Sequence, residues 1–185
     1  MLGKGGFYLA GGTALALRLG HRISVDLDFF SSVFFDPDQL LLKLQTLCET
    51  PIHVFQKTEG SLCIQMQQTK VEIFHYPYPQ LKPVESIEGI TLASLIDNGV
   101  MKFSALVNRG TKKDFSDMAA LLEIHQLSDW ISYYQEKFPH SDTFMLTKSL
   151  VWFDDAELDP NPKMLNHQTW SDVKSSISKA VLELT

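Results

Sequence analysis

The chain has 185 residues, an apolar fraction of 44% and a formal net charge of −6 at pH 7. This length fits one domain, or a small domain with a helical appendage, and the apolar fraction is sufficient for a hydrophobic core. The acidic balance argues against a broad surface that coats nucleic acid, because such a surface needs an excess of basic residues. Arg18, Arg22 and nearby aspartates interrupt the longest apolar run, so we expect no membrane-spanning segment.

The N-terminus and the cysteines indicate the cellular compartment. The first residues, Met-Leu-Gly-Lys-Gly-Gly, are too short and too soon followed by predicted structure to form a signal peptide. Cys48 and Cys63 fall on separate predicted elements without the spacing of metal ligands, so we expect reduced thiols and no disulfide. Together these features predict a cytoplasmic protein.

The first half of the chain predicts a small mixed sheet. Residues 7–10 and 24–30 are typical of strands, and residues 13–19 between them have the spacing of a short helix. Asp36 followed by Pro37 predicts the start of a second helix, with a buried stripe of Leu40, Leu41, Leu44 and Leu47. Short turns then separate three more strands, which predicts an antiparallel meander over residues 52–57, 62–67 and 70–76.

The second half of the chain predicts helices. Pro77, Pro79 and Pro83 break the strand pattern and mark the expected boundary. Thr91 is predicted to cap a helix that runs to about Asn108, and the next helix opens at Thr111 with an apolar face of Phe115, Met118, Leu121 and Leu122. Further helices are expected over residues 128–138, 142–153 and 169–184. The predicted fold class is α+β, with a sheet-bearing core over residues 1–83 and a helical region over residues 84–185 that packs on it.

A glycine pair lies between the first predicted strand and the first predicted helix, in the run Gly11-Gly12-Thr13. Glycines let a phosphate group approach the backbone at a turn, and a helix start offers free N–H groups and the positive end of a dipole. The following strand carries Asp26 and Asp28, which point to one face because strand side chains alternate. A phosphate cradle beside two hard oxygen ligands suits magnesium-dependent chemistry on a nucleoside triphosphate. Taken singly, the glycines also fit an ordinary turn, and the aspartates also fit a solvent-facing strand.

The neighbours of the two aspartates strengthen the metal interpretation. We expect the buried face of this strand to comprise Val25, Leu27 and Phe29. The other face then comprises Ser24, Asp26, Asp28 and Phe30. Adjacent carboxylates repel each other unless a cation neutralises them, and a bound Mg²⁺ would do so.

Glu72 is the best candidate for a third acid. It is an acid inside an otherwise apolar predicted strand, Lys70-Val71-Glu72-Ile73-Phe74. Two-metal phosphoryl chemistry usually requires such a third carboxylate for the second ion and the attacking hydroxyl. The alternative is an ordinary solvent-facing strand residue. His75 fits a polar strand end better than a ligand.

Basic residues gather in the second half of the chain, at Lys102, Arg109, Lys112 and Lys113. In an acidic protein such a local basic site suits one anionic substrate better than a long polyanion. The alternative is a solvated helix start, where Asp114 and Asp117 favour the helix dipole and the lysines stay in water. The sequence contains no Gly-x-Ser-x-Gly, Cys-x-x-Cys or His-Glu-x-x-His motif, so serine-nucleophile and zinc chemistry find no support.

Two blocks of the chain resemble one protein family. The run from Gly11 to Phe30, GGTALALRLGHRISVDLDFF, resembles the first motif of the abortive-infection nucleotidyltransferase toxins of the AbiEii/AbiGii type. That family belongs to the DNA polymerase β-like nucleotidyltransferase superfamily. The stretch from Leu95 to Leu122, with Met101-Lys102 and Arg109-Gly110-Thr111-Lys112-Lys113-Asp114-Phe115-Ser116-Asp117, resembles its later helical motif. The resemblance covers about residues 7–122, with the two blocks in the family's order.

The resemblance implies roles for the residues of the first block and for the third acid. Gly11, Gly12 and Thr13 would hold the triphosphate, with Ser24 nearby. The magnesium ligands, two ions being implied, would be Asp26, Asp28 and Glu72. The superfamily usually has aspartate as its third acid, so Glu72 departs from the pattern by one methylene.

The resemblance also implies roles for the helical block. Lys102 and Lys113 would neutralise phosphate charge or hold the nucleotide, and Asp114 and Asp117 would shape the far wall of the site. The pair His21-Arg22 matches the family's pair before the strand, where it would meet the substrate or only position the loop.

The leading hypothesis is a magnesium-dependent nucleotidyltransferase of toxin type. It would transfer a nucleoside monophosphate from a nucleoside triphosphate to a hydroxyl of tRNA, or of a protein, and release pyrophosphate. A cognate antitoxin is implied as a partner. The second hypothesis, motivated by Glu72, is a nucleotide-binding module without turnover, and a third is an interaction domain on the same fold. Pyrophosphate release distinguishes the first two, and magnesium-dependent nucleotide binding distinguishes both from the third.

Overall fold

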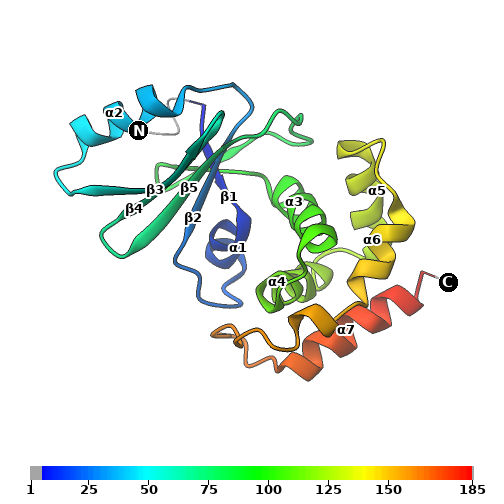
Figure 1. Cartoon of the computed structure of the whole chain (residues 1–185). Helices are drawn as coiled ribbons and strands as arrows, with labels where there is room; N and C mark the ends of the chain where they lie inside the picture. Colours follow the sequence, from blue (N-terminus) through cyan, green and yellow to red (C-terminus); the bar gives the residue numbers. More distant parts are fainter. Residues whose placement is uncertain (1–5, 185) are drawn as a thin grey trace. The chain divides into compact units, whose positions relative to one another are not determined.

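The computed structural model describes residues 6–184, which divide into two compact units. The sheet unit comprises the described residues up to Ala14, Ser24–Pro79 and Pro83–Ala93. The helical unit comprises Leu15–Ile23, Gln80–Lys82 and the described residues from Ser94 onward. Strands and helices both contribute substantially (Figure 1), which confirms the α+β class.

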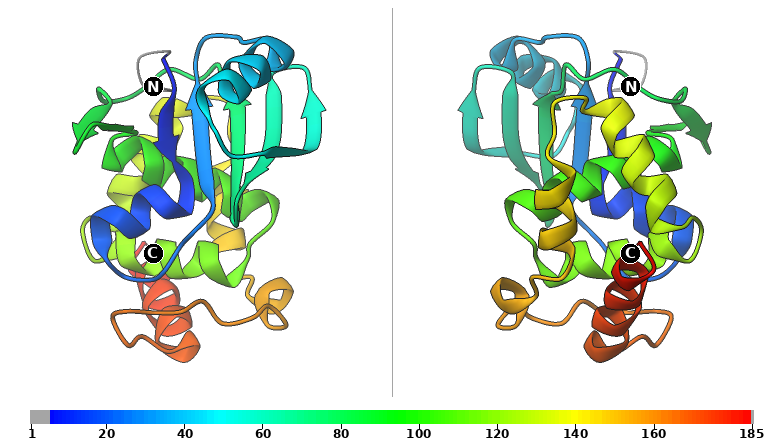
Figure 2. Two further views of the ribbon diagram at one scale, coloured as in Figure 1. Left: turned by 90° about the vertical axis from the view of Figure 1, so that its left-hand side faces the viewer. Right: turned by 90° about the vertical axis from the view of Figure 1, so that its right-hand side faces the viewer.

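The strands of the sheet unit form one mixed sheet in the order β3-β4-β5-β2-β1-β7-β6 (Figure 2). β2 pairs with β5, and β1 with β7, in parallel, whereas the other neighbours are antiparallel. The antiparallel meander predicted over residues 52–57, 62–67 and 70–76 is confirmed as β3, β4 and β5. The bounds are β1 Tyr8–Ala10, β2 Leu27–Ser31, β3 Ile52–Thr58, β4 Ser61–Met66, β5 Thr69–His75, β6 Glu85–Ile87 and β7 Ile90–Leu92.

The hairpin β6–β7 corrects the prediction that a helix starts at Thr91. Thr91 lies in β7, and helix α3 begins only after Ser94, whose side chain accepts a hydrogen bond from the Asp97 N–H as an N-cap. The turn between the two strands has positive φ at Glu88 (+50°) and Gly89 (+80°), as tight hairpin turns require. The sheet therefore continues beyond Pro83 to the residues that precede α3.

The core of the sheet unit lies between the sheet and helix α2, Pro37–Leu47, which Asp36 caps as predicted. Leu40, Leu41 and Leu44 pack on this core, but Leu47 is 52% exposed, so the predicted stripe is one residue too long. Val25 is also exposed, at 65%, because it precedes β2 and does not share the strand's alternation. The thiols of Cys48 and Cys63 are free, as predicted.

Among the described residues, the helical unit contains helices α3 to α7 (Figure 1), a short 3₁₀ turn, η2, and the C-terminal part of helix α1, Gly11–Leu19. Its core includes Phe103, Phe115 and the fully buried Trp130, with Gly99 leaving room for the indole. Thr111 caps α4 as predicted, in a reciprocal capping box with Asp114. Within residues 6–184, no helix is long and apolar enough to cross a membrane. The bounds are α3 Leu95–Asn108, α4 Lys112–Leu122, α5 Leu127–Lys137, α6 Thr143–Leu150, η2 Asp154–Ala156 and α7 Trp170–Leu182.

A buried ion pair joins α3 to α5. Lys137 Nζ lies 2.6 Å from Asp97 Oδ1, and both side chains are fully buried. Asp97 also accepts hydrogen bonds from the backbone N–H groups of Leu81 and Lys82 and from the Ser94 hydroxyl. Although burial disfavours its ionisation, these donors hold the pKa of Asp97 below its usual value. The carboxylate thus anchors the segment of residues 80–82 within the helical unit.

Candidate active site

Gly11 begins helix α1, Gly11–Leu19, directly after β1, with a φ of +69°. Ala10 pairs with Asp28 on the neighbouring strand, which brings the Asp28 carboxylate beside Gly11. A Cβ atom on residue 11 would lie 2.5 Å from Asp28 Oδ2, so the backbone angle and the close approach both require glycine. The helix starts earlier than the predicted range 13–19, and Gly11 and Gly12 therefore contribute to its first turn of N–H groups.

Thr13 fixes the segment that leads into β2. Its buried hydroxyl donates a hydrogen bond to the carbonyl oxygen of Asp26 and lies 2.9 Å from the Ser24 hydroxyl. Asp26 is therefore held just before β2, which begins at Leu27 and not at Ser24 as predicted. The sequence predicts Thr13 as a phosphate-binding residue, and the structure shows in addition that it positions Asp26.

The parallel pairing of β2 and β5 places Asp28 directly opposite Glu72. Register partners in a sheet share one face, so the two carboxylates lie on the same side. Val71 and Ile73, which alternate with Glu72, are buried in the core on the other side. The acid in an otherwise apolar strand is thus explained by alternation, because only one face of β5 is packed in the core.

An aromatic group continues this acidic face along the strands. Phe30 alternates with Asp28 and lies opposite Phe74, with 5.6 Å between the ring centroids. Its ring also stacks on Tyr8 at 6.2 Å and meets Tyr76 edge-on at 5.5 Å. The predicted face of acids closed by an aromatic residue is therefore present at Asp28 and Phe30.

Glu72 is held by a cation. Lys70 Nζ lies 2.8 Å from Glu72 Oε2, with the two side chains 44% and 29% exposed. This hydrogen bond raises the pKa of Lys70, and the negative charges of Glu72 and Asp26 act in the same direction. Cys63 lies opposite Glu72 on β4, and burial, reinforced by the Glu72 charge, raises the pKa of its thiol. Sequence reasoning missed Lys70, although its position two residues before Glu72 on a strand places both on one face.

The donor set of this face fits a hard divalent cation. Asp28 and Glu72 on this face, and Asp26 just before β2, offer carboxylate oxygens, the ligand type that Mg²⁺ prefers, and the ammonium group of Lys70 is already paired with Glu72. Within residues 6–184, no three His, Cys, Asp or Glu side chains converge closely enough to hold a metal ion. In the arrangement described, the three acids therefore do not converge on one point.

In the helical unit, Lys102 is enclosed by two carboxylates. Lys102 Nζ lies 2.9 Å from Asp114 Oδ1 and 2.9 Å from Asp117 Oδ2, and its side chain is almost completely buried. Burial disfavours the ammonium form, but Asp117 and Asp114 outweigh that effect and raise the pKa of Lys102. The structure thus brings together three of the four helical-unit residues that the sequence analysis selects.

Asp117 receives two further partners from the segment after α1. Arg22 Nε lies 2.6 Å from Asp117 Oδ1, and its Nη2 donates to Oδ2 at 2.9 Å. His21 Nε2 lies 2.7 Å from the same Oδ1. Despite burial, the charges of Lys102 and Arg22 and these hydrogen bonds hold the pKa of Asp117 far below its usual value. Arg22 and Lys102 together balance the charges of Asp114 and Asp117.

Lys113 lies outside this buried network and is exposed. Its neighbour Lys112 is buried, and Lys112 Nζ donates to the carbonyl oxygens of Glu157 and Asp159 at 3.0 and 2.9 Å. Arg109 Nε lies 3.5 Å from Asp114 Oδ2, although its side chain is 67% exposed. Lys113 and Arg109 are therefore cations of the predicted basic cluster that are accessible to solvent.

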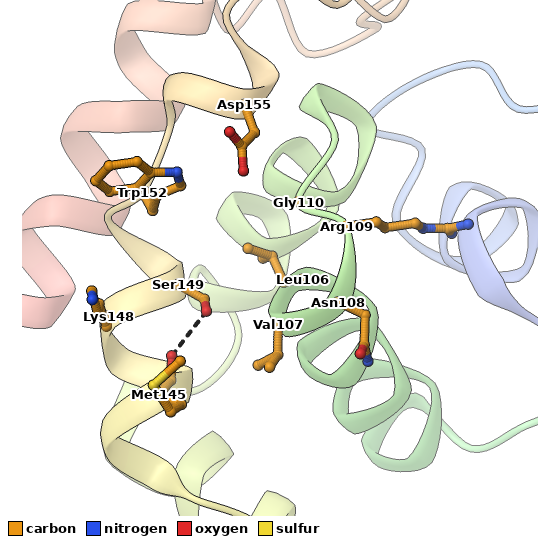
Figure 3. Close-up of a pocket in the computed structure, with 10 residues that line it drawn as sticks. All are labelled: Leu106, Val107, Asn108, Arg109, Gly110, Met145, Lys148, Ser149, Trp152 and Asp155. Atoms are coloured by element: carbon orange, nitrogen blue, oxygen red, sulfur yellow. Dashed lines mark hydrogen bonds between the residues drawn. The ribbon is translucent and has the colours of Figure 1, made fainter.

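A pocket of about 310 Å³ lies beside Arg109, between the end of α3 and α6. Figure 3 shows the Asp155 carboxylate and the Ser149 hydroxyl at this pocket, whereas the Arg109 side chain extends away from α6. Of the residues that the sequence predicts to bind metal or an anionic substrate, this pocket is lined only by Arg109, a member of the basic cluster. Trp152, half-exposed, forms part of its wall.

Comparisons with known proteins identify the chain's relatives. The family model described as "Nucleotidyl transferase AbiEii toxin, Type IV TA system" matches residues 3–182. An uncharacterized protein of Aquifex aeolicus is 32% identical over 181 residues, which is 96% of this chain and 87% of that protein.

Solved structures with the same fold include two bacterial proteins. JHP933 from Helicobacter pylori has a TM-score of 0.61 at 20% identity, over 97% of this chain and 83% of that one. MenT4, a nucleotidyltransferase toxin from Mycobacterium tuberculosis H37Rv, has a TM-score of 0.63 at 15% identity, over 95% of this chain and 74% of that one. At these identities the two structures establish the fold.

The family match and the fold define the class of protein as a nucleotidyltransferase. Because the family model spans nearly the whole sequence, the chain belongs to the AbiEii nucleotidyl transferase toxin family of type IV toxin–antitoxin systems. The resemblance recognised in the two sequence blocks is thereby confirmed.

Replacing Gly11 tests the close packing against Asp28. In Gly11→Ala the methyl group meets the Asp28 carboxylate in addition to the strained backbone angle. Gly20→Ala is the matched control, since Gly20 has a φ of +61° but nothing within 4 Å of an added Cβ. We expect Gly11→Ala to lower the free energy of unfolding by about 1–3 kcal/mol more than Gly20→Ala, measured by urea denaturation. Equal losses of unfolding free energy in the two variants would show that the Asp28 side chain moves aside without an energetic cost.

Acid unfolding tests the buried carboxylates of the helical unit. The folded-state pKa values of Asp97, Asp114 and Asp117 are all lowered. Their stabilisation is therefore fully present above the unfolded pKa of about 3.9 and is lost as the pH falls through and below that value. We expect the free energy of unfolding, followed by tryptophan fluorescence, to be level from about pH 7 to 5 and to drop steeply below about pH 4.

The variant Asp117→Asn assigns part of that dependence. At pH 7 it should cost about 3–5 kcal/mol, because Arg22 and Lys102 lose a buried partner, and its acid limb should be shallower than that of the unsubstituted protein. Asp155→Asn changes the same charge at an exposed position and serves as the control. An acid limb of unchanged steepness in Asp117→Asn would refute the assignment.

Proposed function

We propose that this protein transfers a nucleoside monophosphate from a nucleoside triphosphate to a hydroxyl group in a magnesium-dependent reaction. The observation that carries the proposal is the juxtaposition of Gly11 just after β1, Asp28 near the start of β2 and Glu72 opposite Asp28 in the middle of β5. Membership of the AbiEii family supports the reaction type. In this reaction the acceptor oxygen forms a bond to the α-phosphorus, the bond to the pyrophosphate leaving group breaks, and the hydroxyl proton passes to a base.

Asp26, Asp28 and Glu72 are the residues that would hold the magnesium ions. When bound, the metal would neutralise charge on the triphosphate and favour ionisation of the attacking hydroxyl. One of the three carboxylates would accept the hydroxyl proton. Thr13 supports this arrangement because its hydrogen bond to the Asp26 carbonyl oxygen holds the backbone that carries the Asp26 carboxylate.

Gly11, Gly12 and Thr13 would bind the triphosphate through the first turn of α1, with Ser24 beside them. The N–H groups of a helix start and the positive end of its dipole suit an anionic ligand. Ser24 lies within hydrogen-bonding distance of Thr13, so the two hydroxyls form one polar group. Catalysis by such a site rests on positioning and charge neutralisation.

In the helical unit we propose different roles for the predicted nucleotide-binding residues. Lys113, which is exposed, would contact substrate phosphate directly. Lys102 would neutralise phosphate charge or hold the nucleotide. Asp114 and Asp117 would orient the Lys102 side chain, because both carboxylates already contact its ammonium group. The buried pairing supports a fixed position for Lys102.

For the acceptor we propose the 3′ end of a tRNA, with a protein hydroxyl as the other possibility. The proposal rests on family analogy, and the assay below separates the two. The family description names toxin–antitoxin systems, so we also propose a cognate antitoxin as partner. The reaction would take place in the cytoplasm, where its nucleotide and RNA substrates occur.

A nucleotide-binding module without turnover is a second candidate function. It is favoured by two observations: Glu72 is held by Lys70, and the three acids do not converge. Such a module would bind nucleoside triphosphates and release no pyrophosphate with any acceptor.

Label transfer distinguishes the two functions. Purified protein is incubated with Mg²⁺, each α-labelled nucleoside triphosphate in turn, and total RNA plus lysate, and the products are split by RNase and protease treatment. We expect RNase-sensitive label that falls by at least about 10³-fold in Asp26→Asn and in Asp28→Asn, since charge neutralisation at the phosphate is lost. Asp38→Asn removes an exposed carboxylate of the same unit and should leave transfer unchanged.

The other outcomes of this assay are equally informative. Protease-sensitive label would move the acceptor from RNA to protein. Tight nucleotide binding without label under any condition would refute the enzyme and leave the binding module.

A further inference from the structure

Lys70 is a cation inside the acidic face of the sheet unit. Its ammonium group lies 2.8 Å from the Glu72 carboxylate. Asp28 lies opposite Glu72 on one side, and Cys63 lies opposite Glu72 on the other. Lys70 thus stands among the carboxylates that the proposed function assigns to magnesium.

The exposure of this pair decides what kind of contact it is. The Lys70 and Glu72 side chains are 44% and 29% exposed, whereas those of Lys137 and Asp97 are completely buried. A solvated ion pair contributes little free energy and breaks readily, but a buried pair is costly to break. Lys70 also has a flexible four-carbon stem, so its ammonium can move while its backbone stays in β5.

We propose that Lys70 is a positioning residue that exchanges partners during substrate binding, an inference that rests on the proposed function. Without substrate it holds Glu72 and keeps that carboxylate from a metal ion. When the metal-bound triphosphate enters, Lys70 passes from Glu72 to a phosphate oxygen, and Glu72 becomes available as the third acid. Metal and nucleotide therefore bind together, and metal alone binds weakly.

The exchange follows from the charges involved. A free divalent cation approaching Glu72 meets the positive charge of Lys70, which opposes its binding. A triphosphate brings several negative charges and gives Lys70 an alternative partner of the same chemical kind, an anionic oxygen. Lys70 therefore raises the affinity for the metal–triphosphate complex and lowers the affinity for the metal alone. A lysine that served only to pair with Glu72 would lower metal affinity without helping the triphosphate.

The variant Lys70→Met removes the charge and keeps the length of the side chain. Mn²⁺ alone is titrated by the loss of its free electron paramagnetic resonance signal, and the magnesium complex of inorganic triphosphate is titrated by calorimetry. We expect Lys70→Met to bind Mn²⁺ about fivefold more tightly and magnesium triphosphate about fivefold more weakly than the unsubstituted protein. Lys70→Arg keeps the charge and should change either affinity far less.

Two controls bracket the experiment. Lys57→Met removes one exposed positive charge from the same unit, where Lys57 pairs with Asp38, and should alter neither affinity. Asp26→Asn should abolish Mn²⁺ binding, which shows that the titrated metal is at the acids. Thermal unfolding confirms that the variants are folded, and Lys70→Gln provides the same test if Lys70→Met is not.

Opposite shifts of the two affinities in Lys70→Met support the exchange. Unchanged affinities, or shifts in the same direction, overturn it. Equal Mn²⁺ binding by the unsubstituted protein and by Asp26→Asn also overturns it, because the titrated metal would then lie away from the acids. Failure of the proposed function is separate, because it appears as absence of label transfer and both titrations are performed without turnover.

Discussion

The contact between Gly11 and the Asp28 carboxylate organises the candidate site. Because residue 11 has no side chain, β1 can run beside β2 while Asp28 occupies the space that a Cβ would fill. On its other edge, β2 pairs with β5, which brings Glu72 level with Asp28. The first turn of α1 and two acids from different strands are thus brought together by one short stretch of sheet. Any larger residue at position 11 would displace the acid or the helix start.

Charge is used differently in the two units. In the helical unit, Lys102, Arg22, Asp114 and Asp117 form a buried and balanced network, and Lys137 pairs with Asp97 without exposure to solvent. Such pairs fix geometry because separating them leaves an uncompensated buried charge. In the sheet unit, the pair between Lys70 and Glu72 is partly solvated and therefore able to exchange. We infer that the helical unit holds its charged side chains in fixed pairs. In the sheet unit, Lys70 separates from Glu72 when the metal–triphosphate complex binds.

Local signals in the sequence predicted much of the fold. The central meander and the caps at Asp36 and Thr111 were predictable because turn residues and capping side chains act over a few neighbouring positions. The hairpin β6–β7 was missed, since its strands of three residues each are too short to show alternation, and Val25 was misplaced because strand alternation does not extend before Leu27. Contacts between distant residues, such as Arg22 with Asp117, leave no periodic signal, and the roles of the site residues themselves stay predictions.

The most direct test of this account is a crystal structure of the protein with Mn²⁺ and a non-hydrolysable nucleoside triphosphate, with the metal located by anomalous scattering. We expect an anomalous peak within coordination distance of the Asp26, Asp28 and Glu72 carboxylates, and phosphate oxygens at the first turn of α1. We also expect Lys70 to have left Glu72. A metal bound elsewhere, or a triphosphate bound away from Gly11 while Lys70 still holds Glu72, would contradict it.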